Sequence, residues 1–249
     1  MKPRQLISVI IPALNEEQGI HQTISSIPKE KLSDQGYDIE ILVVDGYSTD
    51  RTGEVAEALG AKVVSERRKG YGRAYKTGFY EAKGDIIVTL DGDGTYPTEL
   101  VPACVQQLTE KGLDFITLNR FSKMEDDAMK LSHRVGNKIL SFAMLLLYSV
   151  NVKDSQSGMW IMTKKFIKEI DLKSDDFSLS EEIKIIAFRY FNAMELEGKY
   201  YKRMGREKLL TIEDGWNNLK YLFRYKSLLK SALRPVTVPL ENNAPESGN

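Results

Sequence analysis

Two aspartates separated by one glycine, Asp91 and Asp93, are the residues of this chain best suited to do chemistry. They follow a short, apolar and β-branched run over 86–90, which predicts a buried parallel strand. Two carboxylates on such a turn can bind a hard divalent cation and leave coordination positions for phosphate oxygens. The alternative interpretation is that Asp-Gly-Asp-Gly is only turn chemistry.

Three other segments place polar residues at the end of a predicted strand or the start of a predicted helix. Residues 11–17 (IPALNEE) open a helix with Asn15 and two glutamates, which helix capping alone would explain. Residues 43–52 (VVDGYSTDRT) put Asp45 at a strand end. Residues 67–74 (RRKGYGRA) combine cations and glycines before a helix, which suits an anion. Their spacing matches neither a dinucleotide fingerprint nor a P-loop.

Strand-like runs alternate with helical patterns through the first half of the chain, which predicts an α/β fold with a doubly wound, mostly parallel sheet. The expected strands cover 6–11, 39–44, 62–65, 86–90 and 115–118, and the expected helices about 15–27, 51–59, 72–83 and 97–111. Ligands of such sheets bind beyond the carboxyl ends of the strands. Asp45 and Asp91 should therefore face one crevice, which favours the metal and phosphate interpretation.

The pattern changes after about residue 120. The charged segment 122–130 is expected to be a mobile loop. A long helix at 132–150, a strand near 159–162 and helices near 163–170 and 179–192 are expected to follow. The tail over 235–249 is rich in Pro, Asn and Ser and is expected to be disordered.

Composition narrows the class of protein. With 249 residues, the chain has the size of one large domain or of a domain with a tail. Its 35 basic and 35 acidic residues balance, which argues against a general nucleic-acid binder. The lone Cys104 excludes a disulfide framework, fits a reducing compartment and is expected in the core. The longest uncharged apolar stretch, 139–152, has 14 residues. That is below the about 20 needed to cross a bilayer, so it fits a core or an interfacial helix.

Taken together, the motifs resemble those of the nucleotide-sugar-dependent glycosyltransferases of the GT-A fold, family 2. The closest likeness is to the polyprenyl-phosphate (dolichyl-phosphate) hexose synthases, and it covers roughly residues 5–230. The matching segments are PALNEE (12–17), VVDGYSTDRT (43–52), KGYGRAYKTGF (69–79), DGD (91–93), NRF (119–121), DSQSG (154–158) and RMGREKL (203–209). Gly46 replaces the second of two consecutive acids in the family's pattern. Thr95 stands where mannose synthases often carry glutamine, and it could still touch the water shell of the metal.

The resemblance implies an inverting transfer of a hexose (mannose, glucose or N-acetylglucosamine) from a GDP- or UDP-linked sugar to a polyprenyl phosphate. Asp91 and Asp93 would hold Mg²⁺ or Mn²⁺ against the diphosphate and would be catalytic together with Arg120 and Arg134. The residues implied to bind the nucleotide sugar are Pro12, Ala13, Asn15, Glu16, Asp45, Lys69 and Gly92. Those implied to bind the acceptor are Arg120, Arg134, Ser157, Arg203 and Lys208.

The class of acceptor decides whether the enzyme needs a base. A lipid monophosphate, with a second pKa of about 6, arrives ionised and requires cations to position it. A sugar hydroxyl would instead require a general base. The candidates for that base are Asp154, Glu181 and Glu182, although Asp154 could instead organise the acceptor loop, and the two glutamates could cap the helix after Ser180.

The C-terminal stretch 216–233 predicts a basic amphipathic helix. Its apolar side comprises Leu219, Leu222, Tyr225, Leu229 and Leu233, and its basic side Lys220, Arg224 and Lys230. Such a helix can lie in an anionic bilayer surface or pack against the catalytic domain. We therefore expect a GT-A domain over 1–212, a membrane-interface helix over 213–234 and a tail. The protein is then expected to be peripheral on the cytoplasmic face of a membrane, with no transmembrane span.

Two other functions remain open at this point. One is a soluble family-2 transferase with a small acceptor, such as phosphoglycerate or a saccharide. The other is a non-catalytic protein that binds sugar nucleotides, against which the intact Asp91 and Asp93 pair argues. The sequence leaves the sugar, the nucleotide base and the oligomeric state undetermined.

Overall fold

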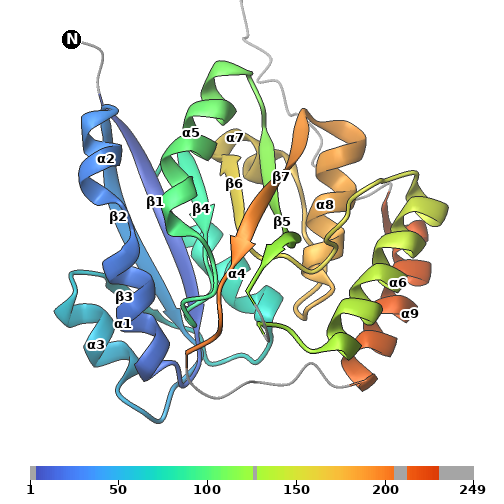
Figure 1. Cartoon of the computed structure of the whole chain (residues 1–249), viewed down its shortest axis with the longest axis horizontal. Coiled ribbons are helices and arrows are strands. Elements are labelled where there is room, and N and C mark those ends of the chain that lie inside the picture. The colour runs from blue at the N-terminus through green and yellow to red at the C-terminus, as the bar shows by residue number, and fades with distance from the viewer. Residues whose placement is uncertain (1–3, 126–127, 205–211, 230–249) are drawn as a thin grey trace, which may run out of the picture.

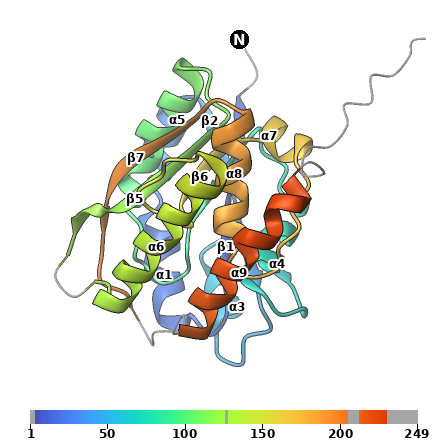
Figure 2. The same cartoon turned by 90° about the vertical axis from the view of Figure 1, so that its right-hand side faces the viewer.

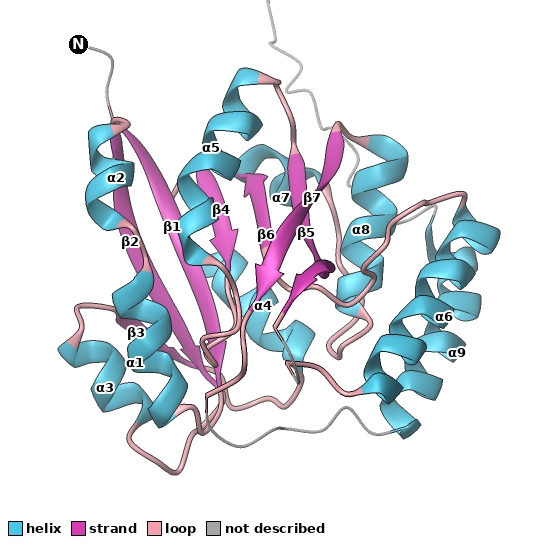
Figure 3. Cartoon of the chain, viewed as in Figure 1, coloured by secondary structure: helices cyan, strands magenta, loops and turns pink. Residues whose placement is uncertain are grey.

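The computed structural model describes residues 4–125, 128–204 and 212–229. A seven-stranded sheet carries helices on both of its faces (Figures 1 and 3). The strand order is β3-β2-β1-β4-β6-β5-β7, and within the described residues β6 alone runs antiparallel to its neighbours. The predicted α/β class with a mostly parallel sheet is confirmed.

The elements follow the predicted alternation. The strands are β1 (Gln5–Ala13), β2 (Tyr37–Asp45), β3 (Lys62–Ser65), β4 (Ile86–Thr89), β5 (Phe115–Met124), β6 (Trp160–Thr163) and β7 (Ala193–Tyr200). The helices are α1 (Glu17–Ser26), α2 (Lys29–Asp34), α3 (Thr52–Ala58), α4 (Tyr71–Glu81), the 3-10 turn Thr98–Leu100, α5 (Val101–Glu110), α6 (Leu131–Tyr148), α7 (Lys164–Glu169), α8 (Leu179–Tyr190) and α9 (Ile212–Leu228).

The central strands are buried on both faces because helices cover each one. Ile10 of β1 belongs to one core, whereas its neighbours Val9 and Ile11 belong to the other, since successive side chains of a strand point to opposite faces. Helices α1, α2, α3 and α5 complete the core around Val9, where Cys104 is also buried as expected. Helices α4, α6, α7, α8 and α9 complete the core around Ile10.

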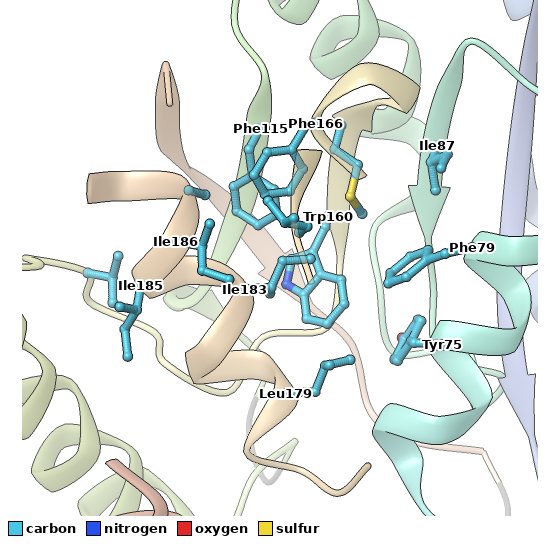
Figure 4. Packing of buried hydrophobic residues seen from close by; sticks show 14 of the residues in the cluster. Tyr75, Phe79, Ile87, Phe115, Trp160, Phe166, Leu179, Ile183, Ile185 and Ile186 are labelled. Carbon is cyan, nitrogen blue, oxygen red and sulfur yellow. The ribbon is translucent and has the colours of Figure 1, made fainter. Parts of the chain in front are cut away.

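The core around Ile10 contains the larger aromatic side chains (Figure 4). Tyr75 of α4 and Trp160 of β6 have ring centroids 5.0 Å apart. Leu179 and Ile183 of α8 approach the same indole from the other side. This packing fixes α4 and α8 against the sheet at the point where β4 ends.

Helices α6 and α9 lie side by side at one edge of the molecule (Figures 1 and 2). Leu222, Tyr225 and Leu229 of the predicted apolar side are buried in the core that α8 also lines. That side of α9 therefore packs against the catalytic domain, which is the second of the two alternatives. Leu233, Lys230 and the tail over 235–249 lie outside the described residues. No described helix has both the length and the apolar content to span a bilayer.

Three features differ from the expectations. The short helix α2 and the strand β7 were not predicted. β7 is an edge strand, and its charged residues obscure the alternation of apolar and polar residues by which a half-buried strand is recognised in a sequence. β5 continues to Met124, where it pairs with Tyr200, so the expected mobile loop over 122–130 is wrong for its first three residues.

The register of the sheet aligns the carboxyl ends of four strands. Ala13 at the end of β1 pairs with Asp45 at the end of β2, and Asp45 pairs with Ser65 at the end of β3. Beyond β4, Leu90 N donates a hydrogen bond to Ile10 O of β1. The polar segments that follow these strands therefore emerge along one edge, as predicted.

Candidate active site

The turn that carries Asp91 and Asp93 packs against the end of β1 and the residues that follow it. A Cβ atom on Gly92 would stand 3.4 Å from the carbonyl oxygen of Pro12 and 3.6 Å from Cβ of Glu16. Gly19 of α1 comes closer still, because a Cβ atom there would lie 2.6 Å from the Gly92 carbonyl oxygen. The structure thus brings the aspartate pair next to the predicted nucleotide-binding segment.

Asp91 has two tyrosines as hydrogen-bond donors. The hydroxyl groups of Tyr71 and Tyr75 lie 3.3 Å and 3.2 Å from Asp91 Oδ1. Burial, together with the charge of Asp93, raises the pKa of Asp91 from 3.8 to about 7. The positive charge around this carboxylate is therefore insufficient, and a bound divalent cation would supply it.

Both oxygens of Asp93 are engaged. Oδ1 accepts hydrogen bonds from the backbone nitrogen of Thr95 at 3.1 Å and from its hydroxyl at 2.7 Å. Oδ2 pairs with Arg203 Nη1 at 2.7 Å. Thr95 is fully buried, and its hydroxyl positions Asp93. The expected contact of Thr95 with the water shell of a metal stays a prediction.

Arg203, predicted among the acceptor residues, pairs with Glu16 and Asp93, which were predicted to bind the donor and its metal. Its Nη2 pairs with the carboxylate of Glu16, which is 8% exposed. The backbone holds it there, since Tyr201 N donates to Thr95 O and Met204 N donates to Asp93 O, both at 3.0 Å. Lys208, the other late cation, lies outside the described residues.

The chemistry of the two aspartates fits a divalent cation that takes its remaining ligands from a substrate. Among the described residues, no three His, Cys, Asp or Glu side chains gather to hold a metal. Hard cations coordinate carboxylate and phosphate oxygens together. The partial ligand set and the raised pKa of Asp91 are both consistent with a metal that arrives with a diphosphate.

Asp45 and Asn15 order the loop that follows β2. Ser48 donates to Asp45 from its backbone nitrogen at 3.1 Å and from its hydroxyl at 2.5 Å. Asn15, in the left-handed region with φ 50°, accepts from Thr49 N at 2.7 Å. Asn15 does not cap α1, because Glu17 N donates instead to the carboxylate of Asp50 from the neighbouring loop. The capping interpretation of Asn15 is therefore wrong, and its side chain joins the β1 and β2 ends.

The glycine-rich start of α4 packs against the loop before α8. A Cβ atom on Gly70 would overlap the carbonyl oxygen of Asp175, and Arg73 N donates to that oxygen at 2.9 Å. The side chains of Arg73 and Lys76 form ion pairs with Asp175. Those two cations of the motif therefore share one carboxylate within the protein, whereas Lys69 is exposed.

A buried ion pair with two contacts fixes Arg120. Its Nε and Nη2 atoms lie 2.7 Å and 2.9 Å from the two carboxylate oxygens of Asp154. Asn137 Nδ2 donates to the same carboxylate at 2.6 Å. Burial opposes ionisation of Asp154, but the charge of Arg120 and these hydrogen bonds lower its pKa to about 2. Asp154 is therefore a permanently ionised residue that positions Arg120, and it is a poor general base.

Arg134 is exposed in the first turn of α6 and borders an open groove of ≈ 870 Å³. The lining residues are Phe121, Ser122, Met124, Glu125, Met129, Lys130, Leu131 and Arg134. Phe121 is the chain neighbour of Arg120 on β5. Asn137, which donates to Asp154, lies one turn after Arg134 on α6. Apolar side chains and two cations thus share one surface.

The segment 154–158 runs from Asp154, the partner of Arg120, to the surroundings of Asp91. A Cβ atom on Gly158 would overlap the Tyr71 hydroxyl and stand 3.4 Å from Asp91 Oδ1. The carbonyl oxygen of Ser157 accepts from Lys184 Nζ at 2.7 Å and from Trp160 Nε1 at 2.8 Å. The Ser157 hydroxyl is buried and has no hydrogen-bond partner among the described residues.

The remaining base candidates are also unsuited to that role. Glu182 accepts hydrogen bonds from Lys173 N at 2.7 Å, Ser174 N at 2.8 Å and the Tyr221 hydroxyl at 2.9 Å, so it joins a loop to α9. Glu181 is fully buried, and burial raises its pKa to about 8. A protonated carboxyl inside the core cannot take a proton from an acceptor in the groove.

The sequence analysis missed the tyrosines around Asp91. Tyr71 and Tyr75 are four residues apart on α4, which places them on one helix face. This spacing of two tyrosines, within and just after the glycine-rich motif, was the sequence signal that both hydroxyl groups could contact one group, which is Asp91. Tyr96 was missed too, and its hydroxyl receives a hydrogen bond of 2.6 Å from Gly158 N.

Residues 8–171 match the family model described as Glycosyl transferase family 2. The chain belongs to this family. It is 32% identical over 223 residues to the low-salt glycan biosynthesis hexosyltransferase Agl6 of Haloferax volcanii, covering 87% of this chain and 52% of Agl6. The chain thus spans about half the length of that relative.

Other family-2 relatives are matched over more of their length. The dolichyl-phosphate hexose transferase of Haloferax volcanii is 31% identical, with 82% of this chain and 86% of that protein covered. Among solved structures, glucosyl-3-phosphoglycerate synthase from Mycobacterium tuberculosis, in complex with Mn²⁺, uridine diphosphate and phosphoglyceric acid, has a TM-score of 0.69 and 23% identity. That match covers 94% of this chain and 81% of the synthase. The GT-A fold predicted from the motifs is confirmed.

Proposed function

We propose that this chain is an inverting, metal-dependent hexosyltransferase that moves a hexose from a GDP- or UDP-linked sugar to a polyprenyl phosphate such as dolichyl phosphate. The observation that carries the choice of acceptor is the buried ion pair of Arg120 and Asp154. It fixes a buried cation next in the chain to Phe121, which lines the groove, and it removes Asp154 as a base. The name of the Haloferax dolichyl-phosphate hexose transferase supports the same acceptor.

In the donor half, Asp91 and Asp93 would hold Mg²⁺ or Mn²⁺, which supplies charge neutralisation for the leaving diphosphate. The proposed nucleotide-sugar ligands are Pro12, Ala13, Asn15, Glu16, Asp45, Lys69 and Gly92. The contacts of Gly92 with the segment after β1 support this grouping. So does the presence of Mn²⁺ and uridine diphosphate in glucosyl-3-phosphoglycerate synthase.

In the acceptor half, the proposed ligands of the phosphate are Arg120, Arg134, Ser157, Arg203 and Lys208. An ionised phosphate attacks without a base, because it has no proton to lose near neutral pH. None of the three candidate bases is available. Asp154 is paired with Arg120, Glu181 is fully buried, and Glu182 accepts hydrogen bonds from within the protein. A phosphate acceptor is therefore favoured over a sugar hydroxyl.

A polyprenyl acceptor also requires contact with a membrane, and α6 offers an apolar surface for it. Its exposed large side chains are Leu131, Val135, Ile139, Phe142, Leu145 and Leu146, which are 72%, 50%, 52%, 60%, 42% and 68% exposed. They recur every three or four residues and so form a stripe along one side of the helix. Leu131 also lines the groove beside Arg134, so the stripe is continuous with the proposed acceptor site.

The neighbouring helix α9 adds to this surface. Trp216 and Phe223, seven residues apart, are 57% and 62% exposed, and Lys220 and Arg224 are exposed as well. Aromatic and basic residues around an apolar stripe suit an anionic bilayer. We therefore assign the membrane-interface role, expected for 213–234 alone, to α6 and α9 together. The protein would be peripheral at the cytoplasmic face, with residues 1–212 as the catalytic domain.

A panel of radiolabelled nucleotide sugars tests this function. With Mn²⁺ and dolichyl phosphate in detergent or vesicles, label should move into an organic-extractable polyprenyl phosphate for at least one GDP- or UDP-sugar. The fold shared with glucosyl-3-phosphoglycerate synthase makes a small phosphorylated acceptor the second candidate. Label that enters phosphoglycerate and not the lipid would decide for that candidate.

A further inference from the structure

Arg203 occupies an unexpected position among the donor residues. Its two terminal nitrogens bridge the carboxylates of Glu16 and Asp93, which are 8% and 4% exposed. The arginine side chain itself is 23% exposed, so the bridge is mostly shielded from water. Two backbone hydrogen bonds between 201–204 and 93–95 hold the arginine in place.

The bridge uses the oxygen through which Asp93 would bind a cation. Thr95 already donates twice to Oδ1, and Arg203 Nη1 lies 2.7 Å from Oδ2. A divalent cation on this aspartate would therefore stand next to a guanidinium. Two positive charges at such a distance repel strongly in a site screened from solvent.

A nucleoside diphosphate changes this balance because it brings several negative charges. Guanidinium groups bind phosphate oxygens through two parallel hydrogen bonds. Once a diphosphate is present, Arg203 has a partner that can replace Asp93 and Glu16. The oxygen of Asp93 then becomes available to the metal that the diphosphate carries.

We propose that Arg203 is a positioning residue that keeps free divalent cations out of the aspartate pair and makes metal and nucleotide diphosphate bind as a unit. This inference rests on the proposed function, in which Asp91 and Asp93 hold the metal. It gives Arg203 a role at the donor side before any acceptor is bound. The ion-pair bridge is the contact that a free cation would have to displace.

The test measures Mn²⁺ binding to the purified full chain without turnover. Free Mn²⁺ is followed by electron paramagnetic resonance, first with protein alone and then with saturating UDP or GDP. The variants are Arg203→Gln, the charge-retaining Arg203→Lys and the matched control Lys202→Gln, which removes one positive charge from the adjacent exposed residue. Circular dichroism and thermal unfolding verify that each variant is folded.

Without nucleotide, Arg203→Gln should bind Mn²⁺ about 10-fold more tightly than the wild type, because one neighbouring like charge is gone. Lys202→Gln and Arg203→Lys should stay near the wild-type affinity. Adding the diphosphate should raise the Mn²⁺ affinity less in Arg203→Gln than in the wild type. In the variant no arginine moves from Asp93 and Glu16 to the diphosphate, so this contribution to the affinity is lost.

Three other results would each refute either the role of Arg203 or the proposed metal function. If Mn²⁺ binds the wild type with UDP or GDP, and Arg203→Gln binds Mn²⁺ alone no more tightly, the role of Arg203 is refuted while the metal-dependent function stands. An equal gain for Lys202→Gln refutes it as well, because general charge would be the cause. If the folded wild type takes up no Mn²⁺ with either nucleotide, the proposed metal function fails and this inference fails with it.

Discussion

At the residue scale, Asp91 is a carboxylate whose ionised form destabilises the folded protein. Its carboxylate is buried beside a second aspartate and receives hydrogen bonds from only two tyrosine hydroxyls within the described chain. Burial without a cation favours the protonated form. A buried carboxylate with a pKa raised this far is typical of a ligand-binding or catalytic site.

Asp91→Asn should stabilise the protein and abolish transfer. The pKa of Asp91 is about 7 in the folded protein against 3.8 in the unfolded chain, so the unfolded chain loses its proton first as pH rises. The wild type therefore loses stability between these two values, and asparagine does not. We expect a gain in unfolding free energy on the order of 1–3 kcal/mol at about pH 8 without metal, and a smaller gain at about pH 5.

Urea unfolding at the two pH values measures this difference. The exposed Asp34→Asn on α2 is the control, since its side chain has little to gain from neutralisation. A gain that is the same at both pH values would contradict the assigned cause.

Thr95→Val tests the support of Asp93. The substitution removes a buried hydroxyl that donates to Asp93 Oδ1 at 2.7 Å and keeps the size of the side chain. A hydrogen bond to a charged group contributes about 1.5–3 kcal/mol, so the Mn²⁺ concentration for half-maximal activity should rise about 10-fold. The KM for the acceptor should stay unchanged. A change in that KM with an unaltered metal requirement would place Thr95 in the acceptor half instead.

At the element scale, one helix determines where the aspartate turn lies. α1 approaches the turn so closely that only glycine fits at position 19, where a Cβ atom would lie 2.6 Å from Gly92 O and 2.7 Å from Asp93 Cα. Both neighbours are backbone atoms and cannot rotate away. The position of α1 therefore controls the geometry of the proposed metal site.

Gly19→Ala should shift the aspartate turn. Overpacking of this kind costs about 1–3 kcal/mol, and a small misplacement of a catalytic group lowers kcat/KM by about 10-fold or more. The matched control is Gly53→Ala on α3, where the nearest atom would be Val63 Cγ1 at 3.9 Å. Thermal unfolding and transfer rates are compared for the two variants. Equal effects would mean that helical glycine as such, and not its contact with the turn, is responsible.

At the scale of the whole molecule, the groove that Arg134 lines and the apolar stripe of α6 are adjacent. Leu131 lines this groove and is also the first residue of the stripe. Helix α9 supports α6 from the inside through Leu222 and Tyr225, while Tyr148 of α6 donates a hydrogen bond to Leu222 O. A bilayer against α6 would thus present a lipid phosphate to the groove without the need to extract the lipid.

Replacement of Phe142 and Leu146 by glutamate should reduce co-sedimentation with vesicles of phosphatidylcholine and phosphatidylserine. Each side chain is at least 60% exposed in the free protein, so the fold should be retained. Loss of two apolar anchors and gain of two negative charges should weaken binding about 10-fold or more. The control is Tyr80→Glu on α4, 86% exposed and outside the stripe.

The same variants distinguish a bilayer from a second copy of the chain. Analytical ultracentrifugation without vesicles should give the same mass for the wild type and for the double glutamate variant. A wild-type dimer that the substitutions dissociate would show that the stripe is a protein interface and would contradict the membrane assignment.

Apart from the short helix α2, the sequence by itself determined the order of strands and helices in the first half of the chain. It also determined the edge of the sheet at which the candidate site lies. The apolar runs that became β1, β2 and β4 each end in the residues that carry the motifs, such as Asp45 and Asp91. Parallel strands have their carboxyl ends on one side, so a linear pattern was sufficient. The GT-A family followed from these local signals, because each motif needs only its own few residues.

The tertiary structure alone decided which charges meet. Arg203 contacts Glu16 and Asp93, and Arg120 contacts Asp154, across long stretches of chain that no periodicity connects. It also decided which side of an amphipathic helix is buried: the apolar side of α9 packs inward, and α6 keeps its stripe outside. Hydrophobic periodicity predicts that a face will be covered, but the covering partner depends on how the elements pack in three dimensions.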